Sequence, residues 1–229
     1  MTDDNYWTQF WIEHGKENRN SDEQTQVLRT YQKKPIDNDL WEFTLNKIDE
    51  HFLVEKGDKV LDLCSGNGLF SKHFVSKGCK STAVDISEDL LLNVKDDSSI
   101  TPIVSDIREL NFNNNYFDKV FFYAGIQYLT HKETIKVLAN IFKWLKKGGV
   151  LYIGDIPDSR KIWTFYNTKE RQKVYFKNLE SGKAIVGTWF DPDFLKNLIK
   201  YIGFQHEEMI EQDPKMIYSK FRFDFKCKK

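Results

Sequence analysis

The fold of this chain is decided by residues 60–71, which read Val60-Leu61-Asp62-Leu63-Cys64-Ser65-Gly66-Asn67-Gly68-Leu69-Phe70-Ser71. An apolar run that carries one acid changes here into a glycine-containing turn and then into an apolar segment, so the stretch predicts strand, loop and helix. Gly66 and Gly68 lack a Cβ, which permits a positive φ and lets a ligand lie directly against the backbone, with helix amides pointing at it. The stretch therefore predicts a cradle for a nucleotide-like ligand.

Short apolar runs alternate with amphipathic segments on the carboxyl side of this stretch, which is typical of βαβ units and a parallel sheet. Right-handed crossovers then place helices on both faces. We expect an α/β fold with a doubly wound, mostly parallel, seven-stranded Rossmann-like sheet that ends in an antiparallel hairpin. The predicted strands cover residues 59–64, 80–85, 100–105, 119–124, 150–154, 204–210 and 216–225. The last two flank an Asp213-Pro214 turn, and Phe221, Phe223 and Phe225 are expected on one face.

The first part of the chain predicts a helical cover. Aromatic residues at helical spacing indicate one helix, namely Tyr6, Trp7, Phe10, Trp11 and His14. The capping-box pattern Ser21-x-x-Gln24 predicts a second helix that ends at Pro35, and residues 37–39 cap a third. We expect Tyr6 and Trp7 also to close over the ligand.

Later helices are marked by caps and glycines. The predicted helices are 69–77 stopped by Gly78, one capped by Ser87, one opened by the Thr130/Glu133 capping box and ended by Gly148, and one from Asp191-Pro192 to Gly203. Residues 157–187 break the alternation, so an insertion with one helix near 160–175 is expected. The predicted organisation is one domain, residues 1–229, with a cover (1–56), a ligand-binding core (57–157), a substrate-side insertion (158–190) and a final helix and hairpin (191–229).

The composition favours a small substrate and an intracellular setting. Lys plus Arg and Asp plus Glu number 34 each, so no net charge points to a nucleic-acid or anionic-membrane partner. Three scattered cysteines form no metal-ligand or disulfide pattern, which favours a reduced cytoplasm and no metal. The polar first residues and the absence of any run near the roughly 20 apolar residues of a membrane span predict a cytoplasmic protein without a signal peptide. We expect a monomer or homodimer.

Residues just past each strand are the candidate binding residues, because a doubly wound sheet binds ligands outside the carboxyl ends of its strands. Asp85 follows the glycines at the distance where an acid accepts hydrogen bonds from both ribose hydroxyls. Asp106 follows the third strand and suits the exocyclic amino group of an adenine. Residues 123–128 follow the fourth strand and would border the reacting atoms.

These strand-end residues resemble the motif series of the class I S-adenosylmethionine-dependent methyltransferases, in which an acid precedes the first glycine by four residues. Asp62, Gly66, Gly68, Asp85 and Asp106 occupy the corresponding places, and the resemblance covers about residues 59–157. It extends to three further segments, Phe117-Asp118-Lys119-Val120, Leu145-Lys146-Lys147-Gly148-Gly149 and residues 189–195. The sequence departs at Cys64-Ser65, where many relatives have glycine-cysteine, so the loop is expected to sit slightly differently.

The resemblance implies S-adenosylmethionine as cofactor, with the Asp62 carboxylate accepting from the ligand ammonium. The expected cofactor contacts are Asp62, Ser65, Gly66, Gly68, Asp85, Ile86, Asp106, Ile107, Tyr123, Gln127, Tyr6 and Trp7. Methyl transfer needs alignment and water exclusion, and a hydroxyl acceptor also needs a base, for which His131 and Asp155 are candidates and His206 a weaker one. The aromatic N-terminus, Ile156-Pro157-Asp158 and Phe221-Arg222-Phe223-Asp224 resemble small-molecule enzymes of bacterial surface-polysaccharide pathways, which suggests a sugar or nucleotide-sugar acceptor.

Two other functions stay open at this point. Tyr128 and Lys132 have the Y-x-x-x-K spacing of an NAD(P)-dependent dehydrogenase, although Ser71 in the third glycine position and the acid Asp62 argue against it. A non-catalytic S-adenosylmethionine-binding protein is the second alternative. DNA amino-methylation is disfavoured, because Ala124-Gly125-Ile126-Gln127 lacks the Asn/Asp-Pro-Pro-aromatic tetrad of that group.

Overall fold

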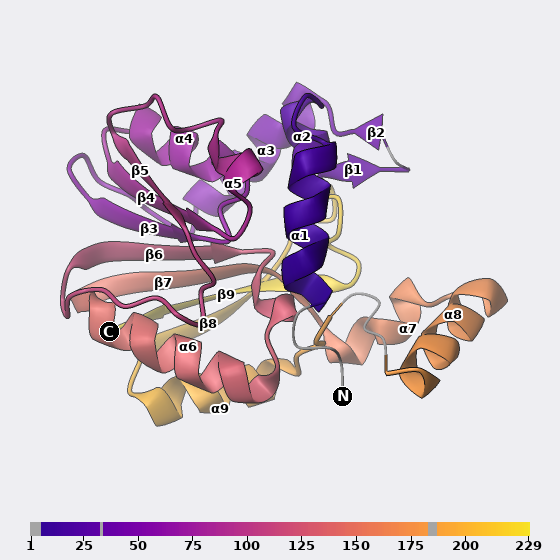
Figure 1. The fold of residues 1–229 in the computed structure, drawn as a ribbon. Coiled ribbons are helices and arrows are strands. Elements are labelled where there is room, and N and C mark those ends of the chain that lie inside the picture. Colours follow the sequence, from indigo (N-terminus) through magenta and orange to yellow (C-terminus); the bar gives the residue numbers. More distant parts are fainter. Residues whose placement is uncertain (1–5, 33, 183–186) are drawn as a thin grey trace.

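The computed structural model describes residues 6–32, 34–182 and 187–229. Its centre is a seven-stranded sheet in the order β5-β4-β3-β6-β7-β9-β8, in which β9 runs antiparallel to both neighbours and the other pairs are parallel (Figure 1). The strands are β3 (Lys59–Leu63), β4 (Lys80–Asp85), β5 (Ile100–Val104), β6 (Phe117–Tyr123), β7 (Leu145–Pro157), β8 (Gln205–Glu211) and β9 (Arg222–Lys228). The doubly wound, mostly parallel fold with its C-terminal antiparallel hairpin is thus confirmed.

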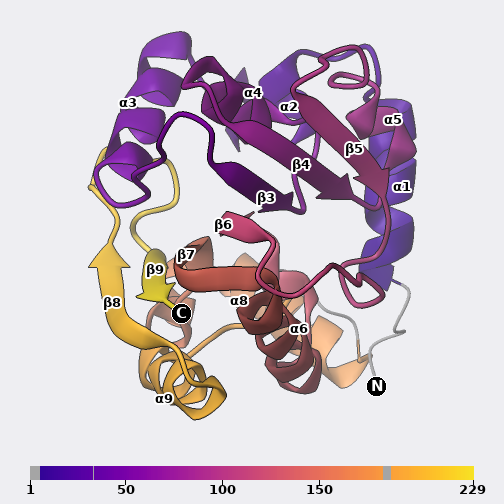
Figure 2. The ribbon, with the colours of Figure 1, turned by 90° about the vertical axis from the view of Figure 1, so that its left-hand side faces the viewer.

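Helices cover both faces of this sheet, as the end-on view in Figure 2 shows. The longer helices are α1 (Tyr6–Glu17), α3 (Asn38–Asp49), α4 (Leu69–Ser76), α6 (His131–Trp144), α8 (Lys169–Glu180) and α9 (Pro192–Ile202). The short elements are α2 (Glu23–Gln26), α5 (Glu88–Leu91), α7 (Ile162–Phe165), η1 (Ile126–Tyr128), η2 (Ser159–Lys161) and the small hairpin β1 (Thr30–Tyr31) with β2 (Lys34–Pro35). None of the helices in the described ranges is long and apolar enough to cross a membrane.

The alternation of side chains along β3 separates two cores. Val60 faces α3 and α4, where Phe52, Phe74 and Phe121 pack in tilted and edge-on pairs. Leu61 and the other odd positions face α6 and α9 in a second, larger core. Both faces of the central strands are therefore buried, as expected for parallel strands between helix layers.

The first helices differ from the sequence prediction at one turn. The N-cap is Asp22, whose carboxylate accepts from the amides of Gln24 and Thr25, in place of the predicted Ser21 box. The helix ends at Gln26 because Leu28 takes a left-handed conformation with φ of 57°. Pro35 lies in strand β2 and does not end a helix.

Two later boundaries also differ. Helix α6 begins at the predicted Thr130/Glu133 capping box but ends at Trp144, because Leu145 already pairs with Phe117 of β6 and so starts β7 earlier than residue 150. In its described residues the insertion holds two α-helices, α7 and α8, and the short 3-10 helix η2, in place of the one predicted helix. In the hairpin, β9 begins at Arg222, so Phe223 and Phe225 share the core while Phe221 precedes the strand.

Residues at the carboxyl edge of the sheet have an unusual backbone conformation. Cys64, Ala124 and Asp155 follow or lie near the ends of β3, β6 and β7, and each has a positive φ between 52° and 57°. Non-glycine residues rarely adopt this conformation, and such strain gathers at binding sites. In Figure 1, α1 lies beside this edge and the α7–α8 segment projects away from it.

Candidate cofactor and acceptor site

A cavity of about 500 Å³ opens at this carboxyl edge. Its walls come from the glycine loop, the ends of β4, β6 and β7, the first helices and the β8–β9 connection. The volume lies in the range typical of small-molecule sites. Of the residues predicted to contact the cofactor, the following line this cavity: Tyr6, Trp7, Asp62, Ser65, Gly66, Asp85, Ile86, Asp106, Ile107, Tyr123 and Gln127. Their contacts with a bound ligand stay predictions.

The segment around α2 packs against the glycine loop and forms hydrogen bonds with it. Gly66 has φ of +57°, and a Cβ there would lie 2.6 Å from Val27 Cγ1. Asn67 is fully buried and donates from Nδ2 to Glu23 O and to Gln26 Oε1, both at 2.8 Å. Gly68 caps α4 in a left-handed conformation. The loop therefore has a fixed conformation, because a segment some 40 residues earlier in the chain packs directly against it.

Asp85 supports the same loop from the other side. Its carboxylate accepts from the amides of Gly66 (2.8 Å) and Ser87 (2.9 Å), one on each oxygen. Burial raises the pKa of Asp85 against the opposing effect of these amides. Since a carboxylate offers about four lone-pair sites, acceptor capacity is left for ribose hydroxyls.

Asp62 is almost fully buried below the loop, and its Oδ2 accepts from Ser71 Oγ at 2.7 Å. Burial raises its pKa to about 7, and the negative charge of Asp85 adds to this although the Ser71 hydrogen bond opposes it. Without a cation beside it, the Asp62 carboxylate is thus half-protonated near neutral pH. A ligand ammonium would favour the ionised form.

We expect cofactor affinity to depend on pH through Asp62. Binding of an ammonium group requires the carboxylate form, so below pH 7 a proton must leave, and affinity for S-adenosylhomocysteine should fall by about tenfold per pH unit. Calorimetry from pH 8 to 5.5, in buffers of different ionisation enthalpy, should detect this proton release. Asp62→Asn should flatten the profile. An unchanged slope in that variant would show that another group titrates.

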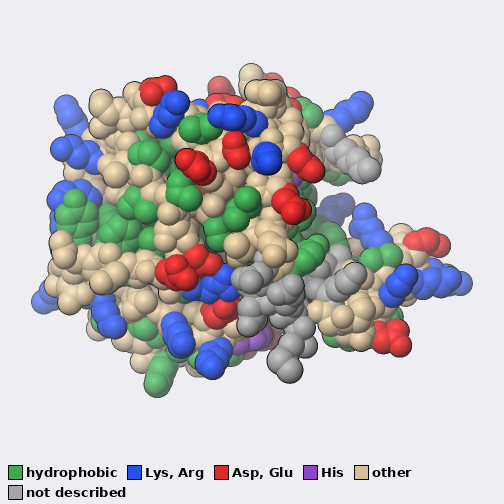
Figure 3. All heavy atoms as spheres, viewed as in Figure 1, with side chains coloured by type: hydrophobic (Ala, Val, Ile, Leu, Met, Phe, Trp, Pro, Cys, Tyr) green, Lys and Arg blue, Asp and Glu red, His purple; other side chains and the backbone are tan. Residues whose placement is uncertain are grey.

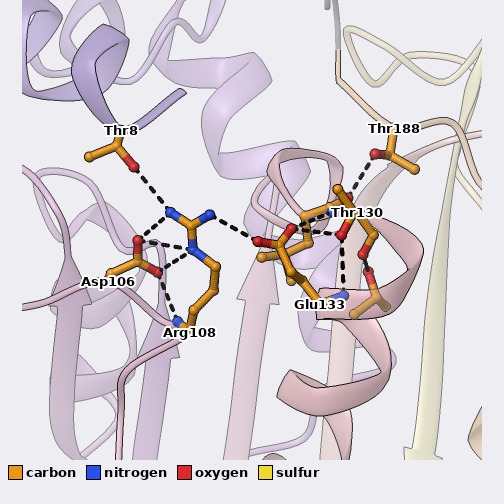
Figure 4. A network of polar contacts seen from close by, with 8 residues as sticks. Thr8, Asp106, Arg108, Thr130, Glu133 and Thr188 are labelled. Atoms are coloured by element: carbon orange, nitrogen blue, oxygen red, sulfur yellow. Dashed lines mark hydrogen bonds and ion pairs between the residues drawn. The ribbon is translucent and has the colours of Figure 1, made fainter. Parts of the chain in front are cut away.

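Asp106 is engaged by Arg108 in the network shown in Figure 4. Arg108 Nε lies 2.9 and 3.0 Å from the two carboxylate oxygens of Asp106, Nη1 donates to Glu133 at 2.9 Å, and Nη2 reaches Thr8 Oγ1 at 3.2 Å. Burial alone would raise the pKa of Asp106, but the hydrogen bonds and charge of Arg108 outweigh it and lower the pKa. The guanidinium therefore ties α1, the loop after β5 and the start of α6 together beside the predicted adenine site.

Aromatic side chains of α1 form one wall of the cavity. Trp7 and Trp11 pack on Tyr128, with ring centroids 4.8 and 5.8 Å apart, while Tyr6 is 44% exposed. Tyr128 is half-buried, and its partial burial raises its pKa to about 12. The aromatic side chains of α1 thus lie against Tyr128, which follows β6, and their closing over a ligand stays a prediction.

We expect the cofactor to slow hydrogen exchange in α1. Amides 6–14 and those of the glycine loop should both gain protection when S-adenosylhomocysteine is added, because Trp7 and Thr8 line the cavity and would close over the ligand. Mass-spectrometric exchange with and without the ligand measures this. Helix α9, which lies outside the cavity, serves as the internal control. Protection confined to the glycine loop would make α1 a fixed cover.

The acceptor side is built around Asp155, which is 4% exposed and lines the cavity. Its positive φ coincides with an irregularity in the β7–β9 pairing between Ile153 and Ile156. Behind it, Asp224 accepts from the Asp155 amide (2.7 Å), from Tyr152 Oη (2.5 Å) and from Gln212 Nε2 (2.7 Å). Burial raises the pKa of Asp224 to about 6. These contacts hold the Asp155 backbone in its strained conformation.

His131, predicted as a second candidate base, is placed elsewhere. It is exposed at the start of α6, and its ring packs against Phe190 and Phe194 at 5.2 and 4.7 Å. It does not line the cavity, because the first turn of α6 directs it toward α9, and His206 on β8 does not line it either. Of the three candidate bases, the cavity contains Asp155 alone.

The cavity residues that the sequence analysis missed in this role include Arg29, Tyr218 and Arg222. Tyr218 Oη donates to Leu28 O or Thr30 O, both at 3.1 Å, and so joins the β8–β9 connection to the first part of the chain. No local pattern marks these residues, because their role depends on contacts between distant segments, which lie 190 positions apart for Tyr218 and Leu28 and 67 for Arg222 and Asp155.

The cavity fits S-adenosylmethionine. Two predicted contact residues, Ser65 and Gln127, have buried side-chain oxygens (Oγ and Oε1) without a hydrogen-bond partner in the described ranges. Asp62 and Asp85 add carboxylates suited to an ammonium and a ribose. Buried polar atoms normally have partners, so these unpaired atoms favour a polar ligand.

Comparisons with known proteins agree with this geometry. Residues 60–149 match a family model described as a methyltransferase domain. Curated relatives are named ubiquinone/menaquinone biosynthesis C-methyltransferase UbiE. The protein of Haemophilus ducreyi is 30% identical over 194 residues, 73% of this chain and 74% of that protein. The protein of Chromobacterium violaceum is 31% identical over 144 residues, which are 57% of each chain.

Solved structures share the fold at low identity. Phosphoethanolamine N-methyltransferase 1 of Haemonchus contortus, in complex with phosphoethanolamine and S-adenosylhomocysteine, has a TM-score of 0.70 at 15% identity and covers 98% of this chain and 48% of its own. A SAM-dependent methyltransferase from Archaeoglobus fulgidus gives 0.62 at 17%, covering 84% and 95%. The [4+2]-cyclase SpnF gives 0.59 at 12%, covering 82% and 81%. Because a cyclase shares the architecture, fold likeness alone does not define the reaction.

The relatives that are similar in sequence identify the family, which the shared fold alone does not. A relative of 30% identity matched over about three quarters of both chains, together with the matched domain model, goes beyond shared architecture. The strand-end acids and glycine loop of the cavity are the features that the resemblance predicted. The chain belongs to the class I S-adenosylmethionine-dependent methyltransferases, whose cofactor is S-adenosylmethionine.

Proposed function

We propose that this protein transfers a methyl group from S-adenosylmethionine to a hydroxylated aromatic small molecule. One observation carries the proposal: the cavity that contains the glycine loop is also lined by Asp155 and by aromatic side chains, most of which lie outside the repeating βαβ units. The aromatic residues of that part are Tyr123, Phe165, Tyr218 and Phe221. Flat rings stack favourably on such walls. The names of the curated relatives, which refer to quinone biosynthesis, point to the same acceptor class.

Methyl transfer needs no covalent intermediate with a side chain of the protein. When bound, the cofactor supplies an electrophilic methyl group on a sulfonium, and the reaction breaks the sulfur–carbon bond and forms one bond to the acceptor. The chain aligns the acceptor, excludes water through α1 and through Phe165 of α7, which line the cavity, and removes the acceptor proton. We assign the removal of that proton to Asp155, because this acid lines the cavity together with Tyr123 and Tyr218.

A sugar or nucleotide-sugar acceptor is the second candidate. Its support is the polar Asp155 and Gln127 in the cavity, which could bind hydroxyl groups. The dehydrogenase alternative has less support, since Tyr128 packs under Trp7 and Trp11 while Lys132 is exposed on α6 and does not line the cavity.

The test is a labelled-methyl assay with two acceptor arms. The protein is incubated with methyl-labelled S-adenosylmethionine and either 1,4-dihydroxynaphthalene or a uridine-diphosphate sugar, and the products are identified by mass spectrometry. Label in the aromatic product that disappears in Asp155→Ala supports the proposal. Label in the sugar arm alone favours the second candidate. Binding of NADPH without S-adenosylhomocysteine in calorimetry would contradict both.

A further inference from the structure

Two buried arginines face the acceptor part of the cavity. Arg29 is 6% exposed and lies in a cage of aromatic rings, with its guanidinium carbon 4.5 Å from the centroid of Tyr123, 5.5 Å from Phe70 and 6.0 Å from Trp41. It lines the cavity beside Leu28. An aromatic cage stabilises a guanidinium but does not neutralise its charge.

Arg222 approaches from the start of β9. It is 8% exposed, and its Nη1 donates to the backbone oxygen of Asp155 at 2.9 Å. Its Nε is buried and has no hydrogen-bond partner among the described residues. The rings of Tyr218 and Phe221 lie within 6.0 Å of its guanidinium carbon. A buried cationic donor without an acceptor is costly unless a ligand supplies one.

Neither arginine takes part in an ion pair with a carboxylate in the described parts of the chain. Asp155 is the acid that acts electrostatically on Arg29, so two positive charges face one negative charge on this side. The other acids that line the cavity lie on the cofactor side and already have partners: Asp62 with Ser71 Oγ, Asp85 with two amides, and Asp106 and Glu133 with Arg108. The cavity thus has an acidic cofactor end and a basic acceptor end.

We propose that Arg29 and Arg222 form an anion-binding subsite that holds a carboxylate or phosphate group of the methyl acceptor. This rests on the proposed function, because it assigns the acceptor to that end of the cavity. Guanidinium groups bind both anions through paired N–H donors, and burial strengthens each hydrogen bond. Tyr123 and Tyr218 line the same cavity of about 500 Å³ as the two arginines, so a flat acceptor bound there would direct its acidic group at them. The anion would also supply the acceptor that Arg222 Nε lacks.

The experiment compares three matched probes by calorimetry, with and without saturating S-adenosylhomocysteine. The probes are 4-hydroxybenzoate, 4-hydroxyphenyl phosphate and the neutral 4-hydroxybenzyl alcohol. The wild-type protein should bind at least one of the two anions more tightly than the alcohol by about tenfold or more, as expected for hydrogen bonds to a charged group. The tighter anion identifies the acidic group.

Variants then test whether the two arginines cause the preference for anions. Arg29→Met and Arg222→Met should each reduce anion binding to the level of the alcohol, and Arg222→Lys, which keeps the charge but lacks Nε, should recover part of it. Arg19→Met is the matched control, because Arg19 is exposed and pairs only loosely with Asp89 at 3.6 Å. Thermal unfolding checks that each variant is folded, and the comparison of probes on the wild-type protein stands even if a variant is not.

Three results would overturn the subsite. The alcohol could bind as tightly as both anions, or Arg222→Met could bind the anions like the wild type. Alternatively, both methionine variants could lose affinity for S-adenosylhomocysteine and keep that for the anions, which would assign the arginines to the cofactor carboxylate. Failure of the wild-type protein to bind S-adenosylhomocysteine would contradict the proposed function instead, and anion binding measured without that ligand would still decide the subsite.

Discussion

Gly66→Val abolishes binding of S-adenosylhomocysteine, with a loss of affinity of more than about a hundredfold. The position has φ of +57°, where a β-branched residue is strained by at least about 1–2 kcal/mol, and the new Cβ would stand 2.6 Å from Val27 Cγ1. The valine must displace either the loop or the α2 segment, and with it Arg29 and the wall of the cavity. Calorimetric titration of the folded variant measures the effect.

Gly57→Val is the control for backbone strain. Gly57 also has a positive φ, +93°, but nothing lies within 4 Å of the position that a Cβ would occupy. This variant should lose stability and keep its affinity for S-adenosylhomocysteine. If both variants bind like the wild type, residues 65–68 form a tight turn without a role in binding.

Asp85→Ala weakens S-adenosylhomocysteine binding by about 1.5–3 kcal/mol, or about 10- to 150-fold, while the protein remains folded. The change removes the acceptor for ribose hydroxyls, and it leaves the amides of Gly66 and Ser87 without the oxygens that they now bond. Part of the loss therefore comes from a loosened glycine loop. Asp85→Asn separates the two contributions, because its single amide oxygen can still accept from one of the amides.

Asp97→Ala provides a matched comparison. Asp97 Oδ1 accepts from the amide two residues later, Ser99 N at 2.8 Å, as Asp85 does from Ser87, but Asp97 lies outside the cavity. Asp97→Ala should leave the affinity for S-adenosylhomocysteine unchanged and should lower the stability of the protein slightly. Equal affinities of Asp85→Ala and Asp97→Ala would contradict the ribose assignment.

Local signals in the sequence predicted local structure well. The capping box of Thr130 and Glu133 is present with both reciprocal hydrogen bonds, and Asp191-Pro192 begins α9 as expected. Such contacts span three residues and need no partner from elsewhere. The same reasoning placed the α2 cap one residue early, because both Ser21 and Asp22 are good N-cap residues and only the surrounding fold selects Asp22.

Boundaries set by distant partners were not predictable in this way. Leu145 belongs to β7 because Phe117 lies opposite it, and the apolar pattern alone placed the strand start at residue 150. The cofactor side of the cavity was foreseen because parallel strands bring their carboxyl ends to one edge. On the acceptor side Asp155 was predicted, but Arg29, Tyr218 and Arg222 were not, because they come from segments outside the repeating units and meet only in the folded protein.

The place of the antiparallel strand β9 in the sheet determines when the sheet is completed during synthesis. It lies between β7 and β8, and both of these precede it along the chain. As the polypeptide leaves the ribosome, β8 has no other neighbour in the sheet and β7 keeps an open edge until residues 222–228 arrive. An antiparallel strand also brings its first residue, not its last, to the carboxyl edge of the parallel strands, and here that residue is Arg222. The basic end of the cavity therefore forms only after both β7 and β8 have been synthesised.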